Sequence, residues 1–157
     1  MHKTAIRRNK ISAPVNWLIA NGYVPKGETW LHYGEGYAFL DTAALNNAIA
    51  FDVYADDPLK RNPQRMSWTY DNAYAGYVFN VVPLEQRLAV MRRLVSITSK
   101  HVYFAVRSDP INGTPFEDGV ITKAGTFQTS YDAAKFGKDF PYATLLHNGG
   151  HYLLGRA

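Results

Sequence analysis

The chain has 157 residues, of which 46% are hydrophobic and 14% aromatic, so a packed core is expected rather than disorder. It contains no cysteine, which excludes a disulfide framework, a thiolate metal site and any mechanism that needs a cysteine nucleophile. The formal net charge of +4 is compatible with a phosphate-bearing partner but does not require one.

The positive charge is concentrated near the N-terminus. Five basic residues precede Glu28, the first acidic residue: Lys3, Arg7, Arg8, Lys10 and Lys26. Such a segment could bind nucleic acid, but a solvated basic surface is the favoured interpretation because the total charge is modest. No stretch approaches the roughly 20 apolar residues that span a bilayer, so we expect a cytoplasmic protein without a membrane partner.

The first predicted elements are a helix, a strand and a second, shorter helix. Ser12 and Pro14 are typical of a helix start, and Gly22 of a helix end. Between them three apolar residues recur at helical spacing: Val15, Leu18 and Ile19. Residues 29–33 then predict a strand, and residues 41–48 predict a short helix.

The central part of the chain alternates strands with one clear helix. Residues 49–54 and 73–79 predict strands, and the second is uncharged, as expected for a strand buried on both faces of a parallel sheet. Pro83 opens an amphipathic helix whose predicted buried face comprises Leu84, Leu88, Met91, Leu94, Val95 and Thr98. With this face buried, three arginines are expected on the solvent-exposed face of the helix: Arg87, Arg92 and Arg93.

Residues 102–106 predict another strand, and the tail predicts a β-hairpin. Asn148 and Gly149 tolerate the positive φ of a tight turn, so residues 144–147 should pair with 151–154. The alternation indicates an α/β, Rossmann-like sheet that is mostly parallel, with the antiparallel C-terminal hairpin at its edge. We expect one domain over residues 1–157, with a basic segment and helix at 1–27 and the core at 28–157.

Two segments are candidates for a ligand site. Gly34 and Gly36 follow the first predicted strand and precede a helix, and Asp52 ends the next strand. A carboxylate there could accept hydrogen bonds from both hydroxyls of a ribose, although an ordinary polar strand end explains it equally well. Because ligands bind beyond the carboxyl ends of parallel strands, residues 34–38, Asp52, the end of strand 73–79 and Arg107 should share one cleft.

Further segments match motifs in a consistent order along the chain: residues 4–14 (T-A-I-x-R-N-x-x-S-x-P), 32–38 (D-Y-G-C-G-x-G), 50–53 (G-Y-D-P), 70–82 (Y-D, then Y-V-L-N-V-I), 106–107 (V-R) and 125–128 (G-T-F-Q). In this order they resemble a family of small class I S-adenosylmethionine (SAM) dependent methyltransferases of phages and bacteria, and methyltransferases associated with DNA phosphorothioation. The resemblance implies that fold and SAM as cofactor.

The resemblance also implies roles for individual residues. The implied SAM-binding residues are Tyr33, Gly34, Glu35, Gly36, Asp52, Val53, Ala75, Gly76 and Tyr77. The implied acceptor-binding residues are Arg8, Asn9, Thr126 and Gln128. Asn80 and Arg107 are the candidate catalytic residues. Methyl transfer from a sulfonium needs alignment more than acid–base help, so these residues would act mainly by positioning.

Several residues depart from the family pattern and keep other functions open. His32 replaces the acid of the glycine motif, Ala38 replaces its third glycine, and Leu40 stands where the family has an aspartate, with Asp41 one place later. A methyltransferase acting on a nucleic acid or small molecule is favoured. The alternatives are a fold that binds SAM, a nucleotide or a protein without turnover, and a nucleic-acid-binding protein.

Other constellations are weaker. Asn80 to Pro83 lacks the first proline and the aromatic residue of the Asn/Asp-Pro-Pro-Tyr motif, so that match is rejected. His147 and His151 flank a turn, but we expect no metal site because no carboxylate pair frames them in the sequence. Four loop acids are expected to be solvated: Asp56, Asp57, Glu117 and Asp118.

Overall fold

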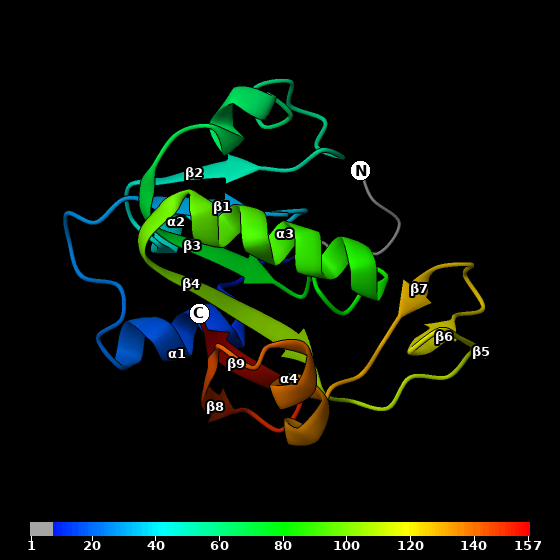
Figure 1. Ribbon diagram of the computed structural model, residues 1–157. Helices are drawn as coiled ribbons and strands as arrows, with labels where there is room; N and C mark the ends of the chain where they lie inside the picture. Colours follow the sequence, from blue (N-terminus) through cyan, green and yellow to red (C-terminus); the bar gives the residue numbers. More distant parts are fainter. Residues whose placement is uncertain (1–7) are drawn as a thin grey trace.

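The computed structural model describes residues 8–157, so Lys3 and the Thr4–Arg7 part of the opening motif lie outside the described residues. The chain then forms, in order, α1 (Ala13–Ala20), β1 (Trp30–Tyr33), α2 (Phe39–Ala44), β2 (Ala48–Phe51), the 3₁₀ helix η1 (Pro63–Met66), β3 (Tyr70–Gly76), α3 (Leu84–Ser96), β4 (Thr98–Arg107), β5 (Thr114–Phe116), β6 (Gly119–Ile121), β7 (Phe127–Gln128), α4 (Ala133–Asp139), β8 (Thr144–Asn148) and β9 (Tyr152–Arg156) (Figure 1).

Six strands form the main sheet in the order β2-β1-β3-β4-β9-β8. The first four are mutually parallel, and the C-terminal hairpin of β8 and β9 is antiparallel, as the sequence predicts. The order of the two hairpin strands was not predicted. β9 lies between β4 and β8 and is antiparallel to both, so the edge strand β8 runs in the same direction as β4. Three short strands, β5 to β7, form a separate antiparallel sheet that projects beside the main one (Figure 1).

Helices cover both faces of the main sheet, because its strands are apolar on both sides. On one face, Met91 and Leu94 of α3 and Phe136 of α4 pack against Ala73 and Phe104. On the other, Val15 and Leu18 of α1 pack with Trp30, Tyr74 and Tyr103. Neighbouring residues of one strand thus alternate between the two cores, with the carboxyl ends of β1 to β4 left free to form a site.

Several predicted boundaries are wrong by a few residues; the strand predicted at 49–54 ends at Phe51, and the strand predicted at 102–106 begins at Thr98. The helix predicted at 41–48 is α2, Phe39–Ala44, since Asn46 and Asn47 adopt positive φ values of 55° and 43° and β2 begins at Ala48. The strand predicted at 73–79 ends at Gly76, because Tyr77 takes φ of 58° and turns the chain out of the sheet. Thr98 belongs to β4 rather than to α3.

The buried face of α3 also differs from the prediction. Arg87, expected in solvent, is fully buried on the same stripe as Met91 and Leu94. Leu84 and Val95, expected in the core, are 37% and 45% exposed. The buried stripe of α3 therefore begins at Arg87 and continues with Met91 at i+4 and Leu94 at i+7.

Arg87 is buried because two carboxylates balance its charge. Its Nη1 contacts Asp118 at 2.7 Å and Asp139 at 2.9 Å, and its Nη2 donates to the Val82 carbonyl at 2.9 Å. Lys135 adds a contact to Asp118 at 2.5 Å. Asp118, predicted to be a solvated loop acid, instead connects the small sheet to α3 and α4.

Within residues 8–157, no helix combines the length and the apolar character that crossing a bilayer demands.

Candidate functional site

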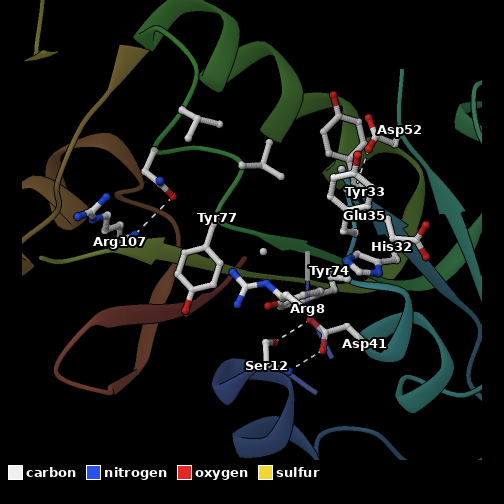
Figure 2. Close-up of a pocket in the computed structure, with 18 of the residues that line it drawn as sticks. Arg8, Ser12, His32, Tyr33, Glu35, Asp41, Asp52, Tyr74, Tyr77 and Arg107 are labelled. Atoms are coloured by element: carbon white, nitrogen blue, oxygen red, sulfur yellow. Dashed lines mark hydrogen bonds between the residues drawn. The ribbon is translucent and has the colours of Figure 1, made fainter. Parts of the chain in front are cut away.

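A cavity of about 530 Å³ opens at the carboxyl ends of β1 to β4, within the size range of small-molecule sites. Asp52 and Tyr33 lie at one end and Arg107 at the other, with Tyr77 and Arg8 between them (Figure 2). Residues at the ends of β1 to β4 thus line one space, as the strand pattern predicts, and Gln128 of β7 and the segment before α1 join them.

The glycine loop after β1 forms the first wall of the cavity. Gly34 and Gly36 have φ of 69° and 56°, which side chains rarely adopt. A Cβ at Gly34 would also lie 2.6 Å from Val78 Cγ2, so the loop packs against the segment that follows β3. The Gly34 N–H donates to the Phe51 carbonyl at 2.7 Å, which holds the bend against the end of β2.

Asp52 is 6% exposed and lies directly against this loop. Its Oδ2 accepts the Gly36 N–H at 2.9 Å, and its Oδ1 accepts the Tyr54 N–H at 2.9 Å. Each carboxylate oxygen has a second lone pair, so the group can still accept from a ligand hydroxyl. The loop and the carboxylate therefore share one side of the cavity and are joined by a direct hydrogen bond.

His32 of β1 and Glu35 of the loop that follows it form a buried network. Glu35 accepts from Lys60 at 2.5 Å through one oxygen and from the Thr42 hydroxyl through the other. Since that hydroxyl donates to Glu35, His32 Nδ1 must donate to Thr42 Oγ1, 2.7 Å away. Burial lowers the pKa of His32 to about 3, with a smaller contribution from Lys60, so the imidazole is neutral.

A second acid, Asp41, connects the segment before α1 to α2. Its two oxygens accept the Ser12 N–H and the Ser12 hydroxyl, both at 2.7 Å (Figure 2). The Ser12 hydroxyl is therefore not the helix cap that the sequence suggests. Burial raises the pKa of Asp41, although the Ser12 hydrogen bonds act in the opposite direction. This contact fixes the chain that leads to Arg8, whose guanidinium lies 5.4 Å from the centre of the Tyr77 ring.

The opposite end of the cavity is built around Arg107. Its backbone N–H donates to Asn80 Oδ1 at 3.4 Å, and its Nη1 donates to Gln128 Oε1 at 3.0 Å. The Thr129 N–H donates to the Asn80 carbonyl at 2.8 Å, so the segments after β3 and β7 meet at the end of β4.

The sequence did not predict that His151 and Asp109 form a pair at the rim of the cavity. His151 Nδ1 lies 2.7 Å from Asp109 Oδ1, and both residues line the cavity. No local sequence pattern indicates this single carboxylate beside His151; antiparallel pairing of β4 with β9 brings the two residues together. His147 stacks on Trp17 instead, with ring centres 4.8 Å apart. Among residues 8–157 no group of three or more His, Asp or Glu side chains is arranged to hold a metal ion.

Most of the implied site residues line this cavity: Arg8, Tyr33, Gly34, Glu35, Gly36, Asp52, Val53, Gly76, Tyr77, Asn80, Arg107 and Gln128. Three do not. Ala75 is buried in the core on the α3 face, Asn9 is exposed outside the cavity, and Thr126 bonds to Thr122 in the turn before β7. Leu40 is exposed, while Asp41 lines the cavity in its place.

The residues that sequence reasoning missed are Ser12, Asp41, Lys60, Asp109 and His151. Of these, Asp41 carried a signal, because it lies one place after the position at which the family has an aspartate.

No protein-family model and no curated protein matches the chain. Several solved structures are similar in fold. The 1,6-didemethyltoxoflavin-N1-methyltransferase of Burkholderia thailandensis, with bound 1,6-didemethyltoxoflavin and S-adenosylhomocysteine, has a TM-score of 0.64 at 14% identity, covering 92% of this chain and 75% of that one. The complex of DhpI with S-adenosylhomocysteine has a TM-score of 0.58 at 13% identity, covering 90% and 85%.

Magnesium protoporphyrin IX methyltransferase from Synechocystis, with bound SAM, has a TM-score of 0.54 at 15% identity, covering 90% of this chain and 74% of that one. Identities this low establish a shared fold and no more. The Rossmann-like class I methyltransferase fold expected from the sequence is thereby confirmed.

Proposed function

We propose that the protein is a SAM-dependent methyltransferase whose cofactor occupies the cavity between the Gly34–Gly36 loop and Asp52. The observation that carries this proposal is the hydrogen bond from the Gly36 N–H to Asp52 at the mouth of the cavity. It places a tight backbone bend and a carboxylate on the same side of a space large enough for an adenosyl group.

The residues of this end fit such a cofactor. Asp52 retains one lone pair on each oxygen for the ribose hydroxyls, and the two amide donors keep the carboxylate in a fixed orientation. Glu35 is paired with Lys60 and bonded to Thr42, so the acid in the loop is already neutralised. The neutral His32 and the paired Glu35 therefore leave no unpaired charge in this wall of the cavity.

SAM supplies an activated methyl group on a sulfonium, so the chain has to align an acceptor rather than activate a leaving group. Asn80, Arg107 and Gln128 lie at the other end of the same cavity and are suited to orient that acceptor. Arg8 and Tyr77 lie between the two ends, where they would separate bulk water from the reacting groups.

A protein that binds SAM without transferring its methyl group is a second candidate. It is favoured by His32, which replaces the acid of the family's glycine motif and is buried and neutral, so this position offers the cofactor no carboxylate. A structure of the complex with SAM discriminates the two. In an enzyme the methyl group faces open cavity toward Arg107, and in a binding protein it packs against protein atoms.

The test of the proposal is calorimetric titration of the protein with SAM and with S-adenosylhomocysteine. Asp52→Asn should weaken binding by about 1–3 kcal/mol, roughly 5- to 150-fold in Kd, because the charge-assisted hydrogen bonds to the ribose are lost. Asp57→Asn is the matched control, since Asp57 is an exposed acid in the same loop that supports a local turn. An absence of heat and of thermal stabilisation at millimolar SAM would refute the proposal, and unchanged affinity in Asp52→Asn would place the ribose elsewhere.

A further inference from the structure

The end of the cavity at Arg107 carries a positive charge that the described residues leave unbalanced. From residue 8 onward, the Arg107 guanidinium contacts only neutral oxygens: those of the Gln128 amide at 3.0 Å and the Pro110 carbonyl at 3.4 Å. Its Nε is buried and has no hydrogen-bond partner among the same residues. Asp109, the acid nearest in sequence, is engaged by His151.

The two amides beside Arg107 are oriented by it. Asn80 Oδ1 accepts the Arg107 backbone N–H, and Gln128 Oε1 accepts its Nη1. Because both neighbouring groups are donors, the amide oxygens must face them, and the two NH₂ groups are directed away. No residue between 8 and 157 accepts a hydrogen bond from either NH₂ group, and both side chains line the cavity.

Internal bonding therefore turns both amide oxygens toward Arg107 and occupies one lone pair on each, so the groups that this cluster presents to the cavity are mainly donors. A half-buried guanidinium with two amide NH₂ groups is complementary to a ligand group that has several acceptor oxygens and a negative charge. A hydroxyl or an amine would leave the positive charge of Arg107 uncompensated.

We propose that Arg107, Asn80 and Gln128 form an anion subsite for the methyl acceptor, which therefore bears a carboxylate or a phosphate group. That the bound anion belongs to a methyl acceptor rests on the proposed function, whereas the existence of the anion subsite does not. The carboxylate of SAM is a competing occupant, and the experiment has to separate the two.

The experiment titrates ¹⁵N-labelled full-length protein with sodium phosphate and, separately, with sodium acetate, at constant ionic strength. The Arg107 Nε–H and the side-chain amides of Asn80 and Gln128 are followed by NMR, first in free protein and then at saturating S-adenosylhomocysteine. Both anions are expected to shift these three signals in a saturable way with millimolar Kd, with and without the cofactor product. Tighter phosphate binding indicates a phosphorylated acceptor, and tighter acetate binding a carboxylated one.

Variants make the test specific. Gln128→Glu places a carboxylate beside Arg107 and should weaken anion binding at least tenfold, while S-adenosylhomocysteine binding stays within about twofold of wild type. Arg107→Lys keeps the charge but loses the planar donor set, so a several-fold loss is expected. Arg92→Gln is the control, because Arg92 is exposed on α3 outside the cavity and its loss should change nothing.

Three results would overturn the proposal: no saturable shift of the three signals, wild-type anion affinity in Gln128→Glu, or an equal loss in Arg92→Gln. Anion binding that S-adenosylhomocysteine abolishes competitively would also overturn it, since the subsite would then hold the carboxylate of the cofactor. Failure of the cofactor product to bind at all would refute the proposed function instead, and the titration of free protein would still decide whether the anion subsite exists.

Discussion

Arg87 and Arg107 carry the same charge in opposite settings. Arg87 is fully buried, and its guanidinium contacts Asp118 and Asp139 at 2.7 and 2.9 Å. Arg107 faces the cavity and contacts neutral oxygens among the described residues. The first arginine has its counter-charges built into the fold, and the second does not.

The difference separates a structural charge from one available to a ligand. Removing Arg87 would leave buried Asp139 with only the more distant Lys135, at 3.8 Å, as a cation, a costly state in a low-dielectric interior. Removing Arg107 leaves no acid unpaired, because Asp109 keeps His151. Stability should therefore depend on Arg87, and ligand binding on Arg107.

The largest expected effect that tests this comparison is on stability. Arg87→Met should lower the free energy of unfolding by about 3–5 kcal/mol, the cost of breaking a buried ion pair by removing one partner. Arg107→Met should lower it by less than about 1 kcal/mol. Urea denaturation followed by circular dichroism measures both. Equal losses in the two variants would mean that the two arginines do not differ in this way.

A smaller effect is expected in acid. Burial acts to raise the pKa of Asp118, but hydrogen bonds from Arg87 and Lys135 outweigh it and lower that pKa to about 2. Ionised Asp118 therefore contributes stability above the unfolded-state pKa near 3.9, and that stability is lost as the pH falls through about 2. The gap in unfolding free energy between wild type and Asp118→Asn should thus shrink from pH 5 to pH 2.

Protonation of buried His32 does not obscure this measurement. Its folded pKa of about 3 lies below the unfolded value, so stability falls as the pH drops below about 6.5 in both proteins alike. The difference between the two proteins therefore isolates Asp118. A gap that stays constant from pH 5 to pH 2 would contradict the role of Asp118 as a charged partner of Arg87.

The same two arginines show what the sequence could predict. Arg107 ends a strongly apolar strand, and strand ends of a parallel sheet converge, so its place in the cleft with Gly34 and Asp52 followed from pattern alone. Arg87 was predicted to be exposed because it is charged. Its i, i+4, i+7 spacing with Met91 and Leu94, which indicates the buried face of a helix, was given less weight. Its counter-charge, Asp118, lies 31 residues away in a loop that no local pattern connects to α3.

Loop geometry was the other source of error. The strand that contains Ala75 ends early because Tyr77 adopts a positive φ, which is uncommon outside glycine and has no sequence signature. The pairing of Glu35 with Lys60 likewise joins two loops that are 25 residues apart. Residues on strand ends were therefore predictable, and their polar partners on loops were not.

The smallest expected effect comes from making Arg107 resemble Arg87. Gln128→Glu gives the Arg107 guanidinium a carboxylate partner at the position of the present 3.0 Å hydrogen bond. Because both groups are only partly buried, the new ion pair should stabilise the fold by less than about 1 kcal/mol, and 1 M salt should reduce that gain. Thermal unfolding at low and high salt measures it. A salt-independent loss of stability would show that the Gln128 amide already makes a contact that a carboxylate cannot replace, and the contrast between a satisfied Arg87 and an available Arg107 would fail.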